Sequence, residues 1–183
     1  MIEPGPGILL IADPFLKDPN FLRTVVFLCE HNEEGSFGFV INRPYESTLD
    51  ELVPDMEGYS LPVYYGGPVQ MNTIHFLHQC PEEIPGGVEV TKGLYWGGDF
   101  EKAMELVRSG NAQSSKVRFF IGYSGWGENQ LQEELKEKSW LTVNATPKLI
   151  FPDKIEDIWK DALKHLGGDY EMMIHFPIDP QLN

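Results

Sequence analysis

The stretch TVVFLCEHNEEGSFGFVIN, residues 24–42, carries the strongest structural signal in the chain. Residues 24–30 are almost continuously apolar, which is typical of a β-strand covered on both faces. A polar connector, NEEG at residues 32–35, precedes a second β-prone run at residues 36–42. Two such runs joined by a loop of about four or five residues predict a β-hairpin. We expect pairing to end at Arg43-Pro44, because proline has no N–H to donate.

Outside this hairpin, Pro and Gly divide the chain into short elements. Further strands are predicted at residues 7–12, 62–65, 74–79, 88–91, 118–122, 141–145 and 149–151. A short helix is expected at residues 48–53, capped by Ser47, and longer ones at residues 100–109, about 128–138 and 155–166. Asp99 is the expected N-cap of the second helix, and Gly110 and Gly167 are expected to end helices. Asp153 and Glu156 resemble a capping box before the last helix.

The order of these elements bears on the fold class. Strands come first along the chain and then alternate with helices, which favours a mixed-sheet α/β or α+β domain over a doubly wound parallel sheet. The length of 183 residues suits one domain, and no repeat, low-complexity tract or linker divides the chain. We therefore expect a single domain over residues 1–183.

The charge balance argues against several classes of partner. Fourteen Lys and Arg residues stand against 28 Asp and Glu residues, giving a formal net charge of −14 at pH 7. Such a charge repels nucleic-acid phosphates and anionic lipid headgroups. The lysines after residue 130 form no basic stripe, because acidic residues interleave with them. Neither direct nucleic-acid binding nor membrane association is expected.

The two cysteines, Cys29 and Cys80, cannot form a disulfide framework. The first residues, MIEPGPGILLIADP, lack the basic start of a signal peptide. The longest apolar runs fall far short of the roughly 20 residues of a transmembrane helix. We therefore expect a cytoplasmic protein with free thiols.

Residues 9–44, LLIADPFLKDPNFLRTVVFLCEHNEEGSFGFVINRP, resemble the N-terminal signature of the AlgH/YqgE family of bacterial proteins. The resemblance continues through YGGPV at 65–69, FLH at 76–78, GYSGWG at 122–127 and SWL at 139–141, and covers nearly the whole chain. It implies an α+β fold: a mixed, bifurcated β-sheet curled into a barrel-like shape, with about three to four helices packed outside.

The resemblance implies little about chemistry. Members of the family are often described as transcriptional regulators, from a connection with alginate production, but no activity is established and no catalytic residues carry over. Family members usually have Ala-Gly where this chain has Ser124-Gly125. They commonly have a basic residue where this chain has QMNT at residues 70–73, so the resemblance does not bring an anion site to this chain.

Cys29 and His31 lie two residues apart on one predicted strand, so their side chains share a face. A nucleophilic cysteine needs a base within hydrogen-bond reach, and this spacing, about 6–7 Å between Cβ atoms, is loose for that. A buried, inert cysteine is favoured, with His31 bonding the turn. A zinc site from Cys29, His31, His78 and Cys80 would require their strands to be neighbours. Ordinary sheet residues are favoured instead, and no metal is predicted.

The run GYSGWG is expected to form a glycine turn between a strand and a helix, a layout that can cradle an anion. It is not a nucleophile elbow, because Trp126 stands where that motif needs glycine. The favoured alternative is structural, with Trp126 filling the core. Arg43 is suited to bind a carboxylate or phosphate, or to pair inside the fold with Asp13 or Glu30.

These considerations define one candidate ligand pocket. Its residues are His31, Asn42, Arg43, Gly66, Gly67, Ser124, Gly125 and Trp126. Because no clean catalytic set is present, the sequence favours a module that binds a protein or a small ligand, with an indirect effect on transcription. The alternative is an enzyme, a hydrolase or transferase, with a pocket near His31, Arg43 and Ser124. No cofactor is predicted, and the oligomeric state stays open.

Overall fold

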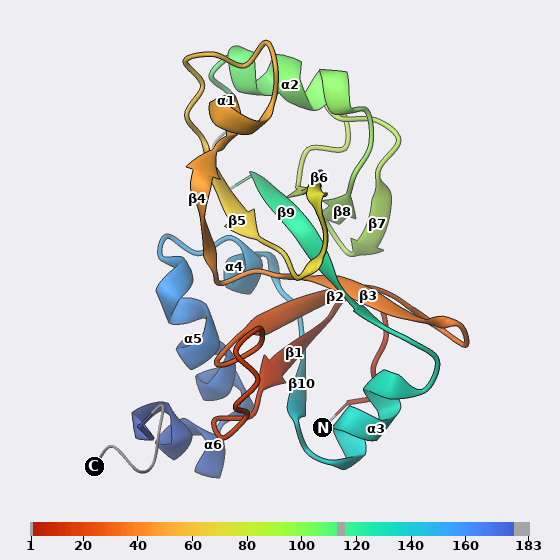
Figure 1. Cartoon of the computed structure of the whole chain (residues 1–183), viewed down its shortest axis with the longest axis vertical. Helices are drawn as coiled ribbons and strands as arrows, with labels where there is room; N and C mark the ends of the chain where they lie inside the picture. Colours follow the sequence, from red (N-terminus) through yellow and green to blue (C-terminus); the bar gives the residue numbers. More distant parts are fainter. Residues whose placement is uncertain (1, 113–115, 178–183) are drawn as a thin grey trace.

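The computed structural model of the chain describes residues 2–112 and 116–177. Within them the strands form a branched ten-stranded sheet, with helices at its two ends and along one side (Figure 1). The strands are β1 (Ile8–Ala12), β2 (Val25–Asn32), β3 (Gly35–Val40), β4 (Pro44–Thr48), β5 (Pro62–Tyr65), β6 (Val69–His78), β7 (Val88–Thr91), β8 (Leu94–Trp96), β9 (Val117–Trp126) and β10 (Trp140–Asn144).

The sheet branches at β9. Its main path runs β10-β1-β2-β3-β9-β6-β8-β7. The first half of β9 lies between antiparallel β6 and parallel β5, which in turn pairs with β4. The last residues of β9 pair with β3 instead, from Gly38↔Ser124 to Ser36↔Trp126. The α+β class and the mixed, bifurcated, curled sheet that the resemblance implied are confirmed.

The predicted hairpin is formed by β2 and β3, in register from Val26↔Val40 to Asn32↔Gly35. The register shifts between Leu28 and Glu30, so that Cys29 is the extra residue of a β-bulge. Residues 25–29 are buried on both faces, as their apolar run predicts, because a separate hydrophobic cluster covers each face of β2.

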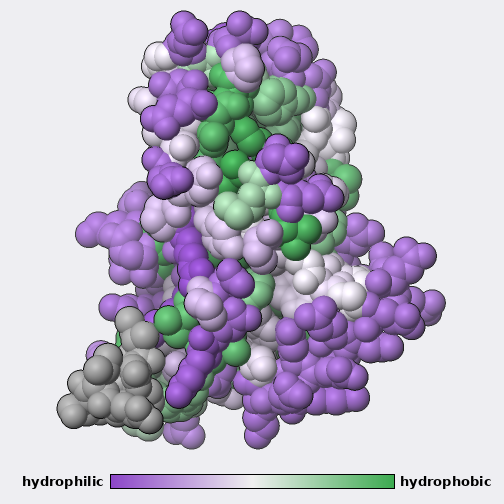
Figure 2. Space-filling view, in the orientation of Figure 1, coloured by the Kyte–Doolittle hydropathy of each residue, from purple (hydrophilic) through white to green (hydrophobic). Residues whose placement is uncertain are grey.

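Three hydrophobic clusters hold the fold together. The largest joins one face of β1, β2 and β3 to the last long helix, from Phe27 and Phe39 to Trp159. Alternate residues such as Leu10 and Leu28 point to the opposite face, where Trp126 and Trp140 pack. The remaining cluster fills the upper part of the molecule as it is drawn in the figures. Apolar residues reach the surface there, whereas hydrophilic residues dominate the lower flanks (Figure 2).

The described residues form six α-helices, against the three to four expected. They are α1 (Leu49–Leu52), α2 (Phe100–Arg108), α3 (Gln130–Lys136), α4 (Pro147–Ile150), α5 (Ile158–Leu166) and α6 (Asp169–Met172), with 3₁₀ turns at Ile155–Asp157 and Met173–His175. The additional α4 and α6 are single turns too short for an amphipathic pattern. None of the helices in the described ranges has the length and hydropathy that crossing a bilayer requires.

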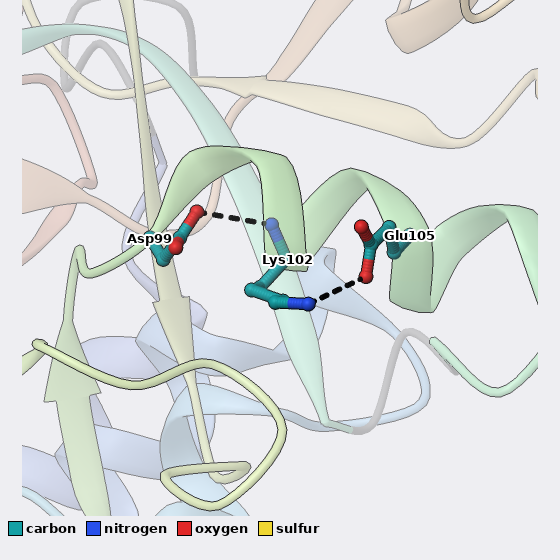
Figure 3. Close-up of polar contacts among 3 residues, drawn as sticks. All are labelled: Asp99, Lys102 and Glu105. Carbon is teal, nitrogen blue, oxygen red and sulfur yellow. Dashed lines mark hydrogen bonds and ion pairs between the residues drawn. The ribbon is translucent and has the colours of Figure 1, made fainter.

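Helix α2 begins as the sequence predicts. Asp99 is its N-cap, and one carboxylate oxygen accepts a hydrogen bond from the backbone N–H of Lys102 at 3.2 Å (Figure 3). One turn later the Lys102 ammonium pairs with the Glu105 carboxylate at 3.2 Å (Figure 3). Both of these side chains are more than half exposed, so the ion pair adds little and the cap matters more.

Several local predictions are wrong, each for a physical reason. The pairing of the β2–β3 hairpin does end before Arg43-Pro44, at Val40, but Pro44 begins a further strand that was not expected, β4, at a first position where a missing N–H is tolerated. Residues 149–151 are not a strand: Thr146 caps α4, and Pro147 occupies its first turn. Three-residue β8 has no recognisable period and was not predicted.

The predicted helix starts are corrected in the same way. Thr48, not Ser47, is the N-cap of α1, and its side chain makes no cap hydrogen bond. The expected capping box at Asp153 and Glu156 is replaced by a 3₁₀ turn that leads into α5. The glycine turn expected at residues 122–127 is strand as far as Trp126, because β3 supplies a partner for it.

Candidate functional site

A cleft of about 580 Å³ opens where the β2–β3 hairpin meets β6, β8 and β9. We call it the aromatic cleft. Its lining residues are Glu30, Asn32, Glu34, Gly35, Ser36, Phe37, Val69, His75, Trp96, Tyr123, Gly125 and Trp126. They come from strands and one turn that are distant in sequence, so only the folded sheet brings them together.

Four half-buried rings form a closed circuit in this cleft. Ring centroids are 4.7 Å apart for Phe37 and Trp96, 6.3 Å for Trp96 and His75, 6.0 Å for His75 and Tyr123, and 5.9 Å for Tyr123 and Phe37. Fully buried Phe39 lies against them, 5.2 Å from His75 and 6.0 Å from Phe37. Three pairs of the circuit are edge-to-face, a favourable geometry that fixes the rings before any ligand arrives.

The bulge at Cys29 brings a carboxylate to these rings. In an unbroken strand Glu30 would share the face of Leu28, which packs in the opposite cluster. The extra residue reverses the alternation, and Glu30 stands directly opposite Phe37 across the hairpin.

A second exception to alternation lies at Gly122, whose φ of +70° is left-handed. Phe120 belongs to the main core, so a regular strand would send Tyr123 to the other face. The left-handed backbone of Gly122, within the strand, instead returns Tyr123 to the face of Phe120 and Phe37. A Cβ at Gly122 would lie 2.3 Å from the carbonyl oxygen of Gly67, so only glycine fits.

Gly125 keeps the cleft open. It lies opposite Phe37 in the β3–β9 register and has no side chain to cover that ring. A Cβ added there would come no closer than 3.5 Å to the Tyr123 ring, which is ordinary contact. A larger residue at this position would therefore stand in the cleft without straining the backbone.

The tautomer of His75 follows from its hydrogen bonds. The Thr73 hydroxyl donates its one proton to the carbonyl of Gln70 at 2.7 Å, so at 3.1 Å it accepts from His75 Nε2–H. His75 Nδ1 is then the unprotonated nitrogen. Burial lowers the pKa of His75, because the charged imidazolium is poorly solvated there, and the ring is neutral at pH 7.

The formal charges on the cleft are negative. Glu30 and Glu34 lie exposed at its rim, and no Lys or Arg is among its lining residues. Asn32 joins the two: its amide nitrogen donates to the Glu30 carboxylate at 3.1 Å, and its amide oxygen accepts from the Glu34 backbone N–H at 2.9 Å. The Glu30 carboxylate is thus held beside the ring circuit, and the Glu34 side chain lies at the same rim.

The eight residues of the sequence-predicted pocket are not all brought together. Gly125 and Trp126 line the aromatic cleft. His31 lies behind it: its Nδ1 is 2.6 Å from the Ser36 hydroxyl, and its ring borders a separate cavity of about 440 Å³ that also contacts Glu128.

Asn42 and Arg43 serve the loop before β2. The Asn42 amide accepts from Val25 N and donates to the carbonyl of Arg23, both at 2.9 Å. The Arg43 guanidinium donates to the carbonyls of Pro19, Asn20 and Leu22 at 2.8–3.0 Å. Arg43 therefore binds backbone rather than Asp13 or Glu30, and it borders a third cavity of about 460 Å³.

The other three residues hold the branch point of the sheet. The hydroxyl of fully buried Ser124 donates to the carbonyl of Gly66 at 3.1 Å. A Cβ on Gly67 would lie 2.2 Å from the carbonyl group of Tyr123. These residues let β5 approach β9 closely. That any of the eight predicted residues contacts a ligand stays a prediction.

The sheet order bears on two hypotheses, a nucleophilic Cys29 and a zinc site. Strands β3 and β9 separate β2 from β6, so Cys29 and His31 are not on a strand next to His78. His78 Nε2 donates to the carbonyl of Gly97 at 2.9 Å, and its Nδ1 accepts from Cys80 N at 3.1 Å. Burial raises the pKa of the Cys29 thiol well above its ordinary value, which opposes thiolate formation. Within residues 2–112 and 116–177, no three His, Cys, Asp or Glu side chains are grouped as metal ligands.

Sequence reasoning missed the residues that dominate the cleft, namely Glu30, Phe37, His75, Trp96 and Tyr123. Phe37 and Phe39 were visible as alternate aromatic residues around Gly38, and Tyr123 as a large ring between glycines. Trp96 carried no usable signal, because its strand is too short.

Known proteins with sequences similar to this chain point to one family. The sequence profile of the family described as AlgH-like matches residues 9–171. The chain is 43% identical to a UPF0301 protein of Chlorobium limicola over 178 residues, which cover 97% of this chain and 95% of that protein. It is 39% identical to a UPF0301 protein of Cytophaga hutchinsonii, over 97% of this chain and 98% of that protein.

Two solved structures share the fold. The AlgH protein of Pseudomonas aeruginosa, also a UPF0301 protein, is 29% identical, with a TM-score of 0.74 and coverage of 97% of this chain and 98% of that one. A protein of Corynebacterium diphtheriae, 22% identical, has a TM-score of 0.79 with 96% and 94% of the two chains covered. At that identity the second likeness concerns the fold alone.

Proposed function

This chain belongs to the AlgH-like family, and from that premise we propose that it is a binding module whose aromatic cleft holds a small organic ligand. The observation that carries the proposal is the circuit of Phe37, Trp96, His75 and Tyr123 around an open cavity of about 580 Å³. Small-molecule sites commonly have volumes of about 300–1,000 Å³, with mostly apolar walls and few polar groups. Fixed rings lose little conformational entropy on binding.

An effect on transcription is, in this proposal, indirect. The net charge of −14 opposes direct contact with nucleic-acid phosphates. A ligand-bound module of this kind acts instead through a partner protein.

An enzyme built on His31, Arg43 and Ser124 has less support. A nucleophilic hydroxyl must be accessible and close to a base. Ser124 is fully buried and donates to a carbonyl, and the guanidinium of Arg43 is engaged by three backbone carbonyls. We therefore place the function in the aromatic cleft.

The test is ligand binding with the cleft open and closed. Benzyl alcohol, benzoate and benzyltrimethylammonium are three aromatic probes of different charge. We expect at least one of them to shift the NMR signals of the Trp96 indole and of the Tyr123 and Gly125 amides in the unaltered protein. Gly125→Val, which puts a β-branched side chain on a strand residue over Phe37, should abolish these shifts.

The matched control is Gly110→Ala, a glycine substitution far from the cleft with no atom within 4 Å of the added Cβ. It should leave the probe-induced shifts unchanged. The proposal fails if none of the three probes affects the cleft signals, or if Gly125→Val binds them as well as the unaltered protein.

A further inference from the structure

The side chains at the rim of the aromatic cleft determine which charge a ligand can carry. This inference rests on the proposed function. The acidic lining residues of the cleft are Glu30 and Glu34, and no lysine or arginine lines it. A phosphate or carboxylate ligand would meet two carboxylates and no counter-charge. The net charge of −14 acts in the same direction at long range.

The rings provide the complementary half of a cation site. Trp, Tyr and Phe attract a cation placed within about 6 Å of the ring centroid, through the negative potential of their faces. Phe37, Trp96 and Tyr123 are half-buried, so each is partly accessible from the cleft. Alkyl groups around the charge would also cover apolar surface on these rings and on Val69.

The fold positions the Glu30 carboxylate next to the rings. The bulge at Cys29 places Glu30 opposite Phe37, and Asn32 holds its carboxylate by a hydrogen bond of 3.1 Å. A cation seated on the Phe37 ring would therefore lie beside a carboxylate that the hairpin already orients. A neutral aromatic ligand would make no use of this arrangement.

His75, the fourth ring, does not oppose a cation. It is neutral at pH 7 because burial lowers its pKa, and its tautomer leaves Nδ1 as a hydrogen-bond acceptor.

We propose that the aromatic cleft binds an organic cation, a quaternary or protonated amine carrying methyl or methylene groups, against the cleft-lining surfaces of Phe37, Trp96 and Tyr123 and beside the carboxylates of Glu30 and Glu34. The ligand is a small molecule, since the cleft volume of about 580 Å³ suits one.

The experiment compares choline with 3,3-dimethyl-1-butanol, its neutral analogue of nearly the same shape, by NMR titration of the Trp96 indole signal. Choline should bind roughly tenfold or more tightly than the neutral analogue, because shape and apolar area are matched and only the charge differs. Benzyltrimethylammonium should exceed benzyl alcohol in the same way, and benzoate should bind most weakly.

Variants then locate the charge effect. Glu30→Gln and Glu34→Gln should each weaken choline binding roughly threefold to tenfold and leave 3,3-dimethyl-1-butanol unaffected. Trp96→Leu should weaken choline binding by about threefold to thirtyfold. The control is Glu33→Gln, which removes an exposed carboxylate of the same turn that does not line the cleft, and should change choline binding least.

The results distinguish a failure of the cation assignment from a failure of the proposed function. If choline and its neutral analogue bind equally, or if benzoate binds best, the cleft is a ligand site but the cation assignment is wrong. If Glu33→Gln weakens choline binding as much as Glu34→Gln, the effect is general electrostatics and the positioned site is refuted. If no probe of any charge perturbs the cleft, the proposed function fails as well.

Discussion

At Gly122 one backbone angle decides where a functional ring points. The left-handed φ of +70° returns Tyr123 to the cleft face, and the missing Cβ lets the carbonyl of Gly67 approach. We expect Gly122→Ala to lower the free energy of unfolding by about 3 kcal/mol or more, from the left-handed backbone and the 2.3 Å clash together.

Chemical denaturation checks this prediction against Gly110→Ala. Gly110 has a φ of +77° but an empty surrounding, so its substitution carries only the conformational penalty of about 1–2 kcal/mol. Equal losses in the two variants would show that the close approach at Gly122 contributes nothing.

His75 makes stability depend on pH in a predictable direction. Burial lowers its pKa in the folded state below the value of about 6.5 in the unfolded chain. Below about pH 6.5 the unfolded chain therefore binds a proton that the folded protein does not, and stability falls with acidification. His78 contributes in the same direction, because burial is the largest influence lowering its pKa.

We expect His75→Gln to reduce the stability lost between about pH 7.5 and pH 5.5, since glutamine keeps a donor for Thr73 and does not titrate. Denaturant unfolding at both pH values measures it. His165→Gln on the exposed side of α5 is the control. A pH dependence identical in all three proteins would contradict the prediction.

At the scale of elements, α3 is fastened to the sheet by one carboxylate. Glu134 Oε2 accepts from the indole N–H of Trp126 at 2.6 Å and from that of Trp140 at 3.0 Å. Both indoles are nearly fully buried. The helix thus satisfies two donors that would otherwise lie unpaired in the core under it.

Glu134→Ala should destabilise the protein by about 2–5 kcal/mol, because each unsatisfied buried donor costs about 1–3 kcal/mol. Glu134→Gln keeps an accepting oxygen and should lose less. Thermal unfolding measures both, with the exposed neighbour Glu133→Ala as control. A Glu134→Ala loss no larger than that of Glu133→Ala would remove this role from the carboxylate.

Elements also show where sequence patterns are reliable. The hairpin and α2 were predictable because their signals are local: an apolar run, a turn and the Asp99 cap. Strand β4 and the end of β9 were not, because their extension depends on partners, β5 and β3, that are distant in sequence. The period of a strand says nothing about which neighbour will pair with it.

At the scale of the whole molecule, negative charge outweighs the ion pairs that the described residues form. The described residues contain two ion pairs, both exposed, against a net charge of −14 for the chain. Raising NaCl from about 0.02 M to about 0.5 M should therefore raise the Tm by about 2–4 °C, because screening relieves more repulsion than attraction. Potassium chloride should act equally, and a fall in Tm with both salts would overturn this reading.

The sequence by itself determined the composition of the buried strands, the hairpin, the main helices, the acidic surface and the family resemblance, because each is a local or additive property of the residues. The tertiary structure alone decided the cleft. Phe37, His75, Trp96 and Tyr123 lie on four strands. Two backbone irregularities, the bulge at Cys29 and the left-handed Gly122, place Glu30 and Tyr123 on the same face of the sheet as Phe37. A bulge forms only when a partner strand sets the register, so its consequence cannot be read from one segment of the chain.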